Sequence, residues 1–191
     1  VIRQAYYEDP AYVPLLLRAY ELWRELERKA ARQLLSVTGG LMLGSPASGV
    51  VAGSLRSAQQ HGLPHELLTA KEIRTRFPQF APEADTVALF EANAGVVRPE
   101  ETVRANLDLA ARLGAELHCE EEVTAWKVVD GRVQVTTPRG NYAAGQLVIA
   151  AGPWFAKVLA DLGLPLSVER QVQFWFEPVG DLEPFLPDRF P

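Results

Sequence analysis

Cysteine, histidine and methionine are scarce in this 191-residue chain, which contains one cysteine, three histidines and one methionine. The lone cysteine, Cys119, excludes an internal disulfide framework and is compatible with a reducing compartment. His61 and His65 are four residues apart, but a glycine and a proline between them break the helix that would place both on one face. His118 adjoins Cys119 on an expected strand, where neighbouring side chains point to opposite faces. We therefore predict neither a metal site nor a Cys–His catalytic pair.

Long apolar runs and blocks of like charge are missing as well. No run approaches the length needed to cross a bilayer, and no basic segment followed by an apolar one opens the chain. The net charge of −5 is spread along the sequence, which gives no reason to expect nucleic acid or an anionic membrane as a partner. We expect a globular protein located in the cytoplasm.

Several common motifs are also absent from the sequence. It contains no Gly-x-Gly-x-x-Gly, no Walker loop, no Cys-x-x-Cys and no Gly-x-Ser-x-Gly. The acidic run Glu120–Glu122 resembles a cation site only superficially, because adjacent carboxylates on an extended chain diverge. We expect a solvated turn there.

Hydrophobic periodicity predicts the helices. Apolar residues recur at three- and four-residue steps over residues 11–33, which is typical of a long amphipathic helix. Residues 48–62 and 70–77 predict two more helices, the second opened by Thr69 with Glu72 at the capping-box position. Proline then starts a fourth helix over residues 99–113.

Alternation and turn residues predict the strands. In the first half we expect short strands at 34–37, 40–44 and 86–91, a brief extended piece at 65–69 and a short apolar run at 96–97. In the second half we expect strands at 116–119, 123–129, 132–137, 142–150 and 167–176. Asp130-Gly131 is a strong signal for a two-residue hairpin turn, and Arg139–Asn141 forms the next turn.

The stretch Gln146–Trp154 is the most informative local pattern. It predicts a buried strand that stops at Gly152 and turns directly into a helix over residues 153–162, because proline suits a first helical position. Ala151 and Gly152 have almost no side chain, so a second backbone or a flat ligand can approach the strand end closely. An ordinary, tightly packed strand–helix junction explains the same residues, and the local pattern alone favours it.

Arg3 is the most informative charge, because it lies in the apolar context Val1–Tyr7 and needs a partner there. A guanidinium fork suits bidentate recognition of a carboxylate, either on a substrate or on an internal Asp or Glu, and the sequence leaves both open. Arg170, in the alternating strand expected at 167–176, poses the same question. A salt bridge or a rim position is expected for it.

Ordered matches along the chain resemble one known family. They are Ile2–Tyr6, Tyr12–Leu16, Glu21–Leu26, Thr38–Leu41, Phe90–Val96, Val148–Trp154 and Arg170–Val172. In this order and spacing they resemble the FAD-dependent amine oxidases of the sarcosine oxidase and N-methyltryptophan oxidase type, within the D-amino-acid-oxidase-like superfamily.

The resemblance implies roles for particular residues. Arg3 falls where such oxidases hold the substrate carboxylate near the flavin. Val123 falls where a strand residue lies against the adenine end of FAD. Ala151, Gly152 and Trp154 fall in the second segment that contacts the flavin.

The departures from the family pattern bear on what this chain does alone. The family's Gly-x-Gly-x-x-Gly would precede Val1, and its flavin-bearing cysteine and a substrate-binding lysine would follow Pro191. Cys119 does not match that cysteine. Both ends are expected to be cut from a longer protein, and we expect the isolated chain to hold FAD weakly and to be inactive.

The resulting prediction is a mixed α/β fold that combines a partial FAD-binding, Rossmann-like half with part of an antiparallel-sheet substrate domain. Residues 1–33 and 95–163 are assigned to the flavin side, and residues 34–94 and 164–191 to the substrate domain. The implied function is oxidation of the C–N bond of an amino acid or N-methyl amino acid to an imine, with O2 reduced to H2O2. The alternative is a non-catalytic α/β module without flavin, and in either case exposed cut faces favour self-association.

Overall fold

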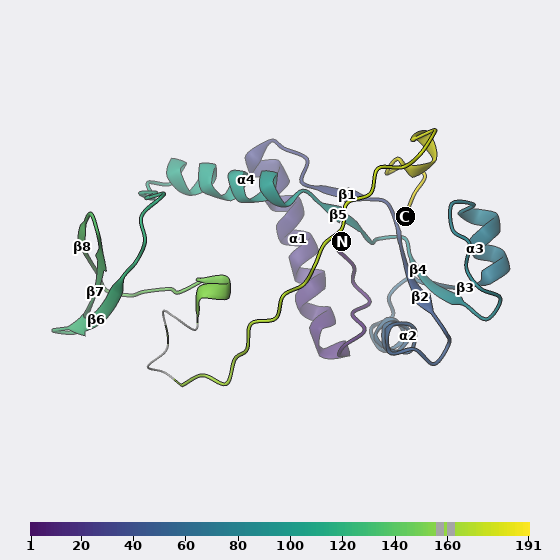
Figure 1. Cartoon of the computed structure of the whole chain (residues 1–191), viewed down its shortest axis with the longest axis horizontal. Helices are drawn as coiled ribbons and strands as arrows, with labels where there is room; N and C mark the ends of the chain where they lie inside the picture. The colour runs from purple at the N-terminus through teal and green to yellow at the C-terminus, as the bar shows by residue number, and fades with distance from the viewer. Residues whose placement is uncertain (156–158, 160–162) are drawn as a thin grey trace. The chain divides into compact units, whose positions relative to one another are not determined.

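The computed structural model describes residues 1–155, 159 and 163–191. The chain divides into two compact units, one formed by Val1–Ala115 with Glu177–Pro191 and the other by Glu116–Phe176 (Figure 1). Helices and antiparallel sheets alternate along the chain, which confirms the predicted mixed α/β class. The assignment of segments to a flavin side and a substrate side stays a prediction.

The helices of the first unit lie where periodicity and capping residues place them. A 3-10 turn, η1 (Pro10–Tyr12), leads into α1 (Val13–Ala30), and α2 (Gly49–His61) follows Ser48, whose hydroxyl accepts the Val51 N–H. Thr69 and Glu72 form the predicted capping box of α3 (Ala70–Arg76). The remaining elements are α4 (Pro99–Arg112), which packs against α1, and the 3-10 turn η4 (Glu183–Phe185).

Two antiparallel sheets complete the first unit. The strands β1 (Leu35–Val37) and β5 (Gly95–Val97) form a two-stranded sheet. The other sheet has the order β2-β4-β3 and consists of β2 (Gly40–Gly44), β4 (Val87–Glu91) and β3 (Glu66–Thr69). The strands β1, β2 and β4 lie within a residue of their predicted positions, and β3 and β5 form where an extended piece and a short apolar run were expected.

The central strand β4 separates two apolar clusters, because successive side chains of a strand point to opposite faces. Leu89 packs with Ala5, Met42 and Ala58 on the face that α2 covers. Ala88 and Phe90 point to the other face, where their cluster includes the α3 residue Ile73 and its neighbour Phe77. Glu91 follows Leu89 by two residues, so it faces the α2 side and the N-terminal segment.

The segment Val1–Tyr7 is threaded against α2 at very close range. A Cβ on Gly53 would lie 2.1 Å from the Tyr7 carbonyl oxygen, so only glycine fits at this position. The Ser57 hydroxyl, one helical turn further along, donates to the Tyr6 carbonyl. Helix α2 therefore fixes the path of the chain just after Arg3.

The second unit contains one three-stranded antiparallel sheet, formed by β6 (Ala125–Val129), β7 (Arg132–Thr137) and β8 (Gly140–Ala144). Asp130 (φ 49°) and Gly131 (φ 73°) are both left-handed, as a type I′ hairpin turn requires. This confirms the hairpin predicted between β6 and β7. The following turn is formed by Pro138 and Arg139, because Thr137 already pairs with Gly140.

Three predicted strands of the second half are wrong. Residues 116–119, 146–150 and 167–176 form no strand, and β6 begins at Ala125 rather than at Val123. Val148, Phe174 and Trp175 are 89%, 75% and 93% exposed. A strand needs a neighbour for its N–H and C=O groups, and among the described residues these segments have none. Apolar alternation alone therefore overestimated strand formation here.

The helix predicted after Gly152 begins as the 3-10 turn η2 (Gly152–Trp154). Most of its remaining length, residues 156–158 and 160–162, lies outside the described residues. Within the described part of the chain, no helix has both the length and the apolar character that crossing a membrane requires.

Candidate active site around Arg3

The backbone on both sides of Arg3 is anchored to one segment of the first unit, the end of β4 and the start of β5. Ile2 and Gly95 exchange two backbone hydrogen bonds, with N–H to oxygen distances of 2.7 and 2.8 Å. The Gln4 and Ala5 N–H groups donate to the two carboxylate oxygens of Glu91, at 2.6 and 2.8 Å. Arg3 therefore lies between two fixed points.

The Arg3 side chain is held by aromatic rings and by one weak ion pair. Its guanidinium lies 5.3 Å from the ring centres of both Tyr6 and Tyr7, within the range of cation–π attraction. One terminal nitrogen is 3.9 Å from a Glu8 carboxylate oxygen, and Nε is buried without a hydrogen-bond partner among the described residues. Glu8 is thus the internal carboxylate that faces Arg3 in the structure, and this pairing is loose.

Glu91 is the buried charge nearest to this segment, with only 1% of its surface exposed. Burial raises the pKa of the Glu91 carboxyl, while the Ala5 and Gln4 N–H groups and the positive charge of Arg3 oppose that rise. Burial also raises the pKa of Tyr20, whose hydroxyl donates to the Asn93 carbonyl at 2.8 Å. The loop after β4 is therefore tied to α1 by the Tyr20 hydrogen bond, directly after the buried Glu91 carboxylate.

The other predicted site residues belong to the second unit. Gly152 has φ 52°, and a Cβ built on it would meet no atom of the described residues within 4 Å. Trp154 is 66% exposed, Val123 is 44% exposed, and Ala151 is partly buried. The structure thus brings Ala151, Gly152 and Trp154 together on one turn.

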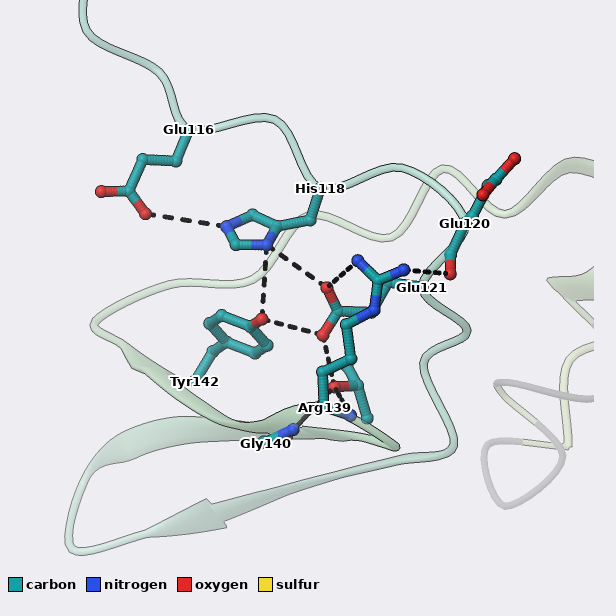
Figure 2. A network of polar contacts seen from close by, with 8 residues as sticks. Glu116, His118, Glu120, Glu121, Arg139, Gly140 and Tyr142 are labelled. Atoms are coloured by element: carbon teal, nitrogen blue, oxygen red, sulfur yellow. Dashed lines mark hydrogen bonds and ion pairs between the residues drawn. The ribbon is translucent and has the colours of Figure 1, made fainter.

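A polar network in the second unit corrects the prediction of a solvated acidic turn (Figure 2). The Glu121 side chain is only 2% exposed and accepts hydrogen bonds from the Thr137 hydroxyl and the Tyr142 hydroxyl, the latter at 2.8 Å. His118 and Arg139 face the same carboxylate at 3.3 and 3.8 Å. These hydrogen bonds lower the pKa of Glu121 and tie the loop before Val123 to the β7–β8 hairpin.

Glu91 and Glu121 are the residues that sequence reasoning missed. The sequence contained a signal for Glu91, because this carboxylate ends an apolar strand. A charge in such a place needs a partner, as was argued for Arg3. No comparable signal marked Glu121, whose partners lie 16 to 21 residues further along the chain. Among the described residues, no cluster of His, Cys, Asp and Glu could hold a metal ion, and Cys119 is exposed and free.

Comparisons with known proteins agree with one another. The chain is 54% identical over 191 residues to monomeric sarcosine oxidase of Streptomyces avermitilis, covering all of this chain and 50% of that protein. It is 33% identical over 180 residues to N-methyl-L-tryptophan oxidase of Yersinia pestis, covering 94% of this chain and 48% of that protein. The chain thus spans about half the length of these relatives.

A similar fold is present in a solved structure of NikD, described as an unusual amino acid oxidase essential for nikkomycin biosynthesis. The TM-score is 0.75 at 30% identity, over 84% of this chain and 42% of NikD. The family described as FAD dependent oxidoreductase matches residues 1–190. The chain therefore belongs to the FAD dependent oxidoreductase family, as its resemblance to amine oxidases predicted.

Proposed function

We propose that the full-length protein oxidises the C–N bond of a small amino acid or N-methyl amino acid, sarcosine or a similar compound, to an imine while O2 is reduced to H2O2. The family and the relatives named above support this reaction class. The observation that carries the proposal is the state of Arg3, a partly exposed guanidinium with a fixed backbone and, among the described residues, one loose ion pair. A cytoplasmic location is part of the proposal.

Arg3 is suited to bind the substrate carboxylate. Its backbone position is set from both sides and its side chain rests on two tyrosine rings, so little conformational freedom remains to be lost on binding. A bidentate guanidinium–carboxylate pair would replace the 3.9 Å contact with Glu8. Arg3 would thereby orient the carbon–nitrogen bond of the substrate toward the oxidant.

The residues present fit the flanking contacts of a flavin. Ala151 and Gly152 have almost no side chain to cover their backbone, and Trp154 offers an exposed aromatic surface on the same turn. Val123 offers an exposed apolar side chain suited to the adenine end, in a loop that the Glu121 network holds. The 191 residues contain no Gly-x-Gly-x-x-Gly motif, so they do not supply the usual phosphate anchor. FAD, when bound, supplies the two-electron acceptor of the reaction.

The proposal is tested with Arg3→Ala in the full-length protein. Losing one or two charge-assisted hydrogen bonds of about 1.5–3 kcal/mol each should raise KM for carboxylate substrates by about tenfold or more, while kcat changes less. Arg18→Ala is the matched control, because Arg18 is an exposed arginine of α1 paired with Glu21. An unchanged KM for Arg3→Ala removes Arg3 from the site. A colourless preparation that gains no flavin absorption when FAD is added supports the non-catalytic alternative.

A further inference from the structure

We infer that Glu91 is the positioning residue for Arg3: its buried carboxylate fixes the backbone that presents the guanidinium to the substrate. This inference rests on the proposed role of Arg3 in binding the substrate carboxylate. It adds a residue 88 positions away in the sequence, on a different element, to the machinery of that site.

The geometry of the two hydrogen bonds carries the inference. Glu91 uses one oxygen for the Gln4 N–H at 2.6 Å and the other for the Ala5 N–H at 2.8 Å. These two N–H groups directly follow Arg3 in the chain, so the carboxylate fixes the direction in which the chain leaves that residue. The Ile2–Gly95 bridge fixes the direction from which it enters.

Because Glu91 is buried, losing its hydrogen bonds to the Gln4 and Ala5 N–H groups would destabilise the protein. Glu91 is 1% exposed, on the face of β4 where Leu89 packs with Ala5. A carboxylate in such surroundings is stable only when hydrogen bonds or a nearby opposite charge compensate the lost water. Two backbone N–H groups supply the hydrogen bonds, and Arg3 supplies the charge.

Arg3 and Glu91 affect each other although their side chains form no hydrogen bond or ion pair that the described residues show. The positive charge of Arg3 stabilises the Glu91 carboxylate, and the carboxylate holds the backbone of Arg3. Loss of either one of the two Glu91 hydrogen bonds releases the segment on one side of Arg3 while leaving the aromatic contacts in place. The guanidinium would then occupy more positions, and fewer of them would suit bidentate binding.

The test uses the full-length flavin-loaded protein and the Glu91→Gln substitution. Glutamine keeps the side-chain volume, but its NH2 group must face one of the two N–H donors, so one hydrogen bond is lost. We expect KM for a carboxylate substrate to rise about tenfold, the equivalent of about 1.4 kcal/mol, with kcat within about twofold. An amine substrate without a carboxylate should keep its KM. Glu91→Asp keeps the negative charge on a shorter side chain, and its KM should lie between those of the unmodified protein and Glu91→Gln. It replaces Glu91→Gln in the test if that variant yields no flavin-loaded protein.

A matched control separates positioning from general destabilisation. Glu72 also accepts a backbone N–H, from Thr69 at 2.7 Å, but it lies in the capping box of α3. Glu72→Gln should lower the melting temperature without changing KM. In an Arg3→Ala background, Glu91→Gln should cause no further rise in KM, because the two residues act as one unit.

The outcomes distinguish the inference from the proposed function. An unchanged KM in Arg3→Ala contradicts the proposed function itself. A raised KM in Arg3→Ala together with an unchanged KM in Glu91→Gln contradicts only the positioning role. Equal losses for substrates with and without a carboxylate, or additive effects in the double variant, also overturn the positioning role.

Discussion

Replacing Glu8 by glutamine should improve the binding of carboxylate substrates, because in the proposed site Glu8 would compete with the substrate carboxylate for Arg3. A carboxylate oxygen of Glu8 lies 3.9 Å from a guanidinium nitrogen of Arg3, and the Glu8 and Arg3 side chains are 41% and 25% exposed. Coulomb's law gives about 1 kcal/mol for such a pair in bulk water and about 4 kcal/mol at an effective dielectric constant of 20. Exposed ion pairs contribute only about 0.2–1 kcal/mol when measured, because solvent screens them.

The lower values apply here, because both side chains are partly solvated and the contact is long. Relief of about 0.5–1 kcal/mol of competition should lower KM for a carboxylate substrate by about two- to fivefold in Glu8→Gln, with kcat unchanged. The hydrogen bond that raises the pKa of Tyr7 also involves Glu8, and glutamine can still accept it. The local structure should therefore survive the substitution.

The assay is steady-state formation of H2O2 from a carboxylate substrate and from a neutral amine, at low and at high salt. The gain should be confined to the carboxylate substrate and should shrink at high salt, as expected for an exposed pair. An unchanged KM at low salt would show that Glu8 does not compete for Arg3. A raised KM would show instead that Glu8 holds Arg3 in place for the substrate.

Two further predictions concern the two units separately. Gly53→Ala should lower the free energy of unfolding by about 1–3 kcal/mol, because the new Cβ would lie 2.1 Å from the Tyr7 carbonyl oxygen. Chemical denaturation measures this free energy. Gly49→Ala is the control and should leave the free energy of unfolding unchanged, because its Cβ meets no atom of the described residues within 4 Å. Equal stability of the two variants would contradict the close packing. In the second unit, the pKa of Glu121 is depressed below the ordinary 4.5, so its stabilising effect is complete above that value and is lost as pH falls through the lower folded-state pKa. The protection factors of the β7 and β8 amides, corrected for the pH dependence of intrinsic exchange, should therefore fall below about pH 4.5, and Glu121→Gln should weaken this acid dependence; protection factors that are independent of pH in both proteins would contradict the network.

Local signals predicted much of the first unit. The capping box of Thr69 and Glu72, the Gly62 stop and the proline at the start of α4 act within a few residues, so the sequence alone reveals them. The Asp130-Gly131 turn is equally local, and its two left-handed residues are as predicted. In these places the strongest energetic preference is encoded in adjacent residues.

Contacts between distant residues could not be predicted in this way. Glu91 meets Gln4 across 87 positions, and its strand pattern alone does not name a partner. The opposite error occurred at residues 146–150, where an apolar run predicted a strand that has no partner among the described residues. Arg3 was identified because a lone charge in an apolar segment demands an explanation, and the same criterion applied to Glu91 would have found it.

We propose above that this chain forms the carboxylate-binding part of a flavin-dependent amine oxidase, and anaerobic reduction of the flavin is the decisive test of that proposal. The flavin absorption of the full-length protein is recorded without oxygen before and after addition of an N-methyl amino acid such as sarcosine. We expect that the absorption bleaches, that the Arg3→Ala variant needs about tenfold more substrate for the same bleaching, and that admitting air restores the colour with formation of H2O2. Flavin that stays oxidised at saturating concentrations of every carboxylate-bearing amine tested, or an Arg3→Ala variant that bleaches at the same substrate concentration, would contradict the proposal.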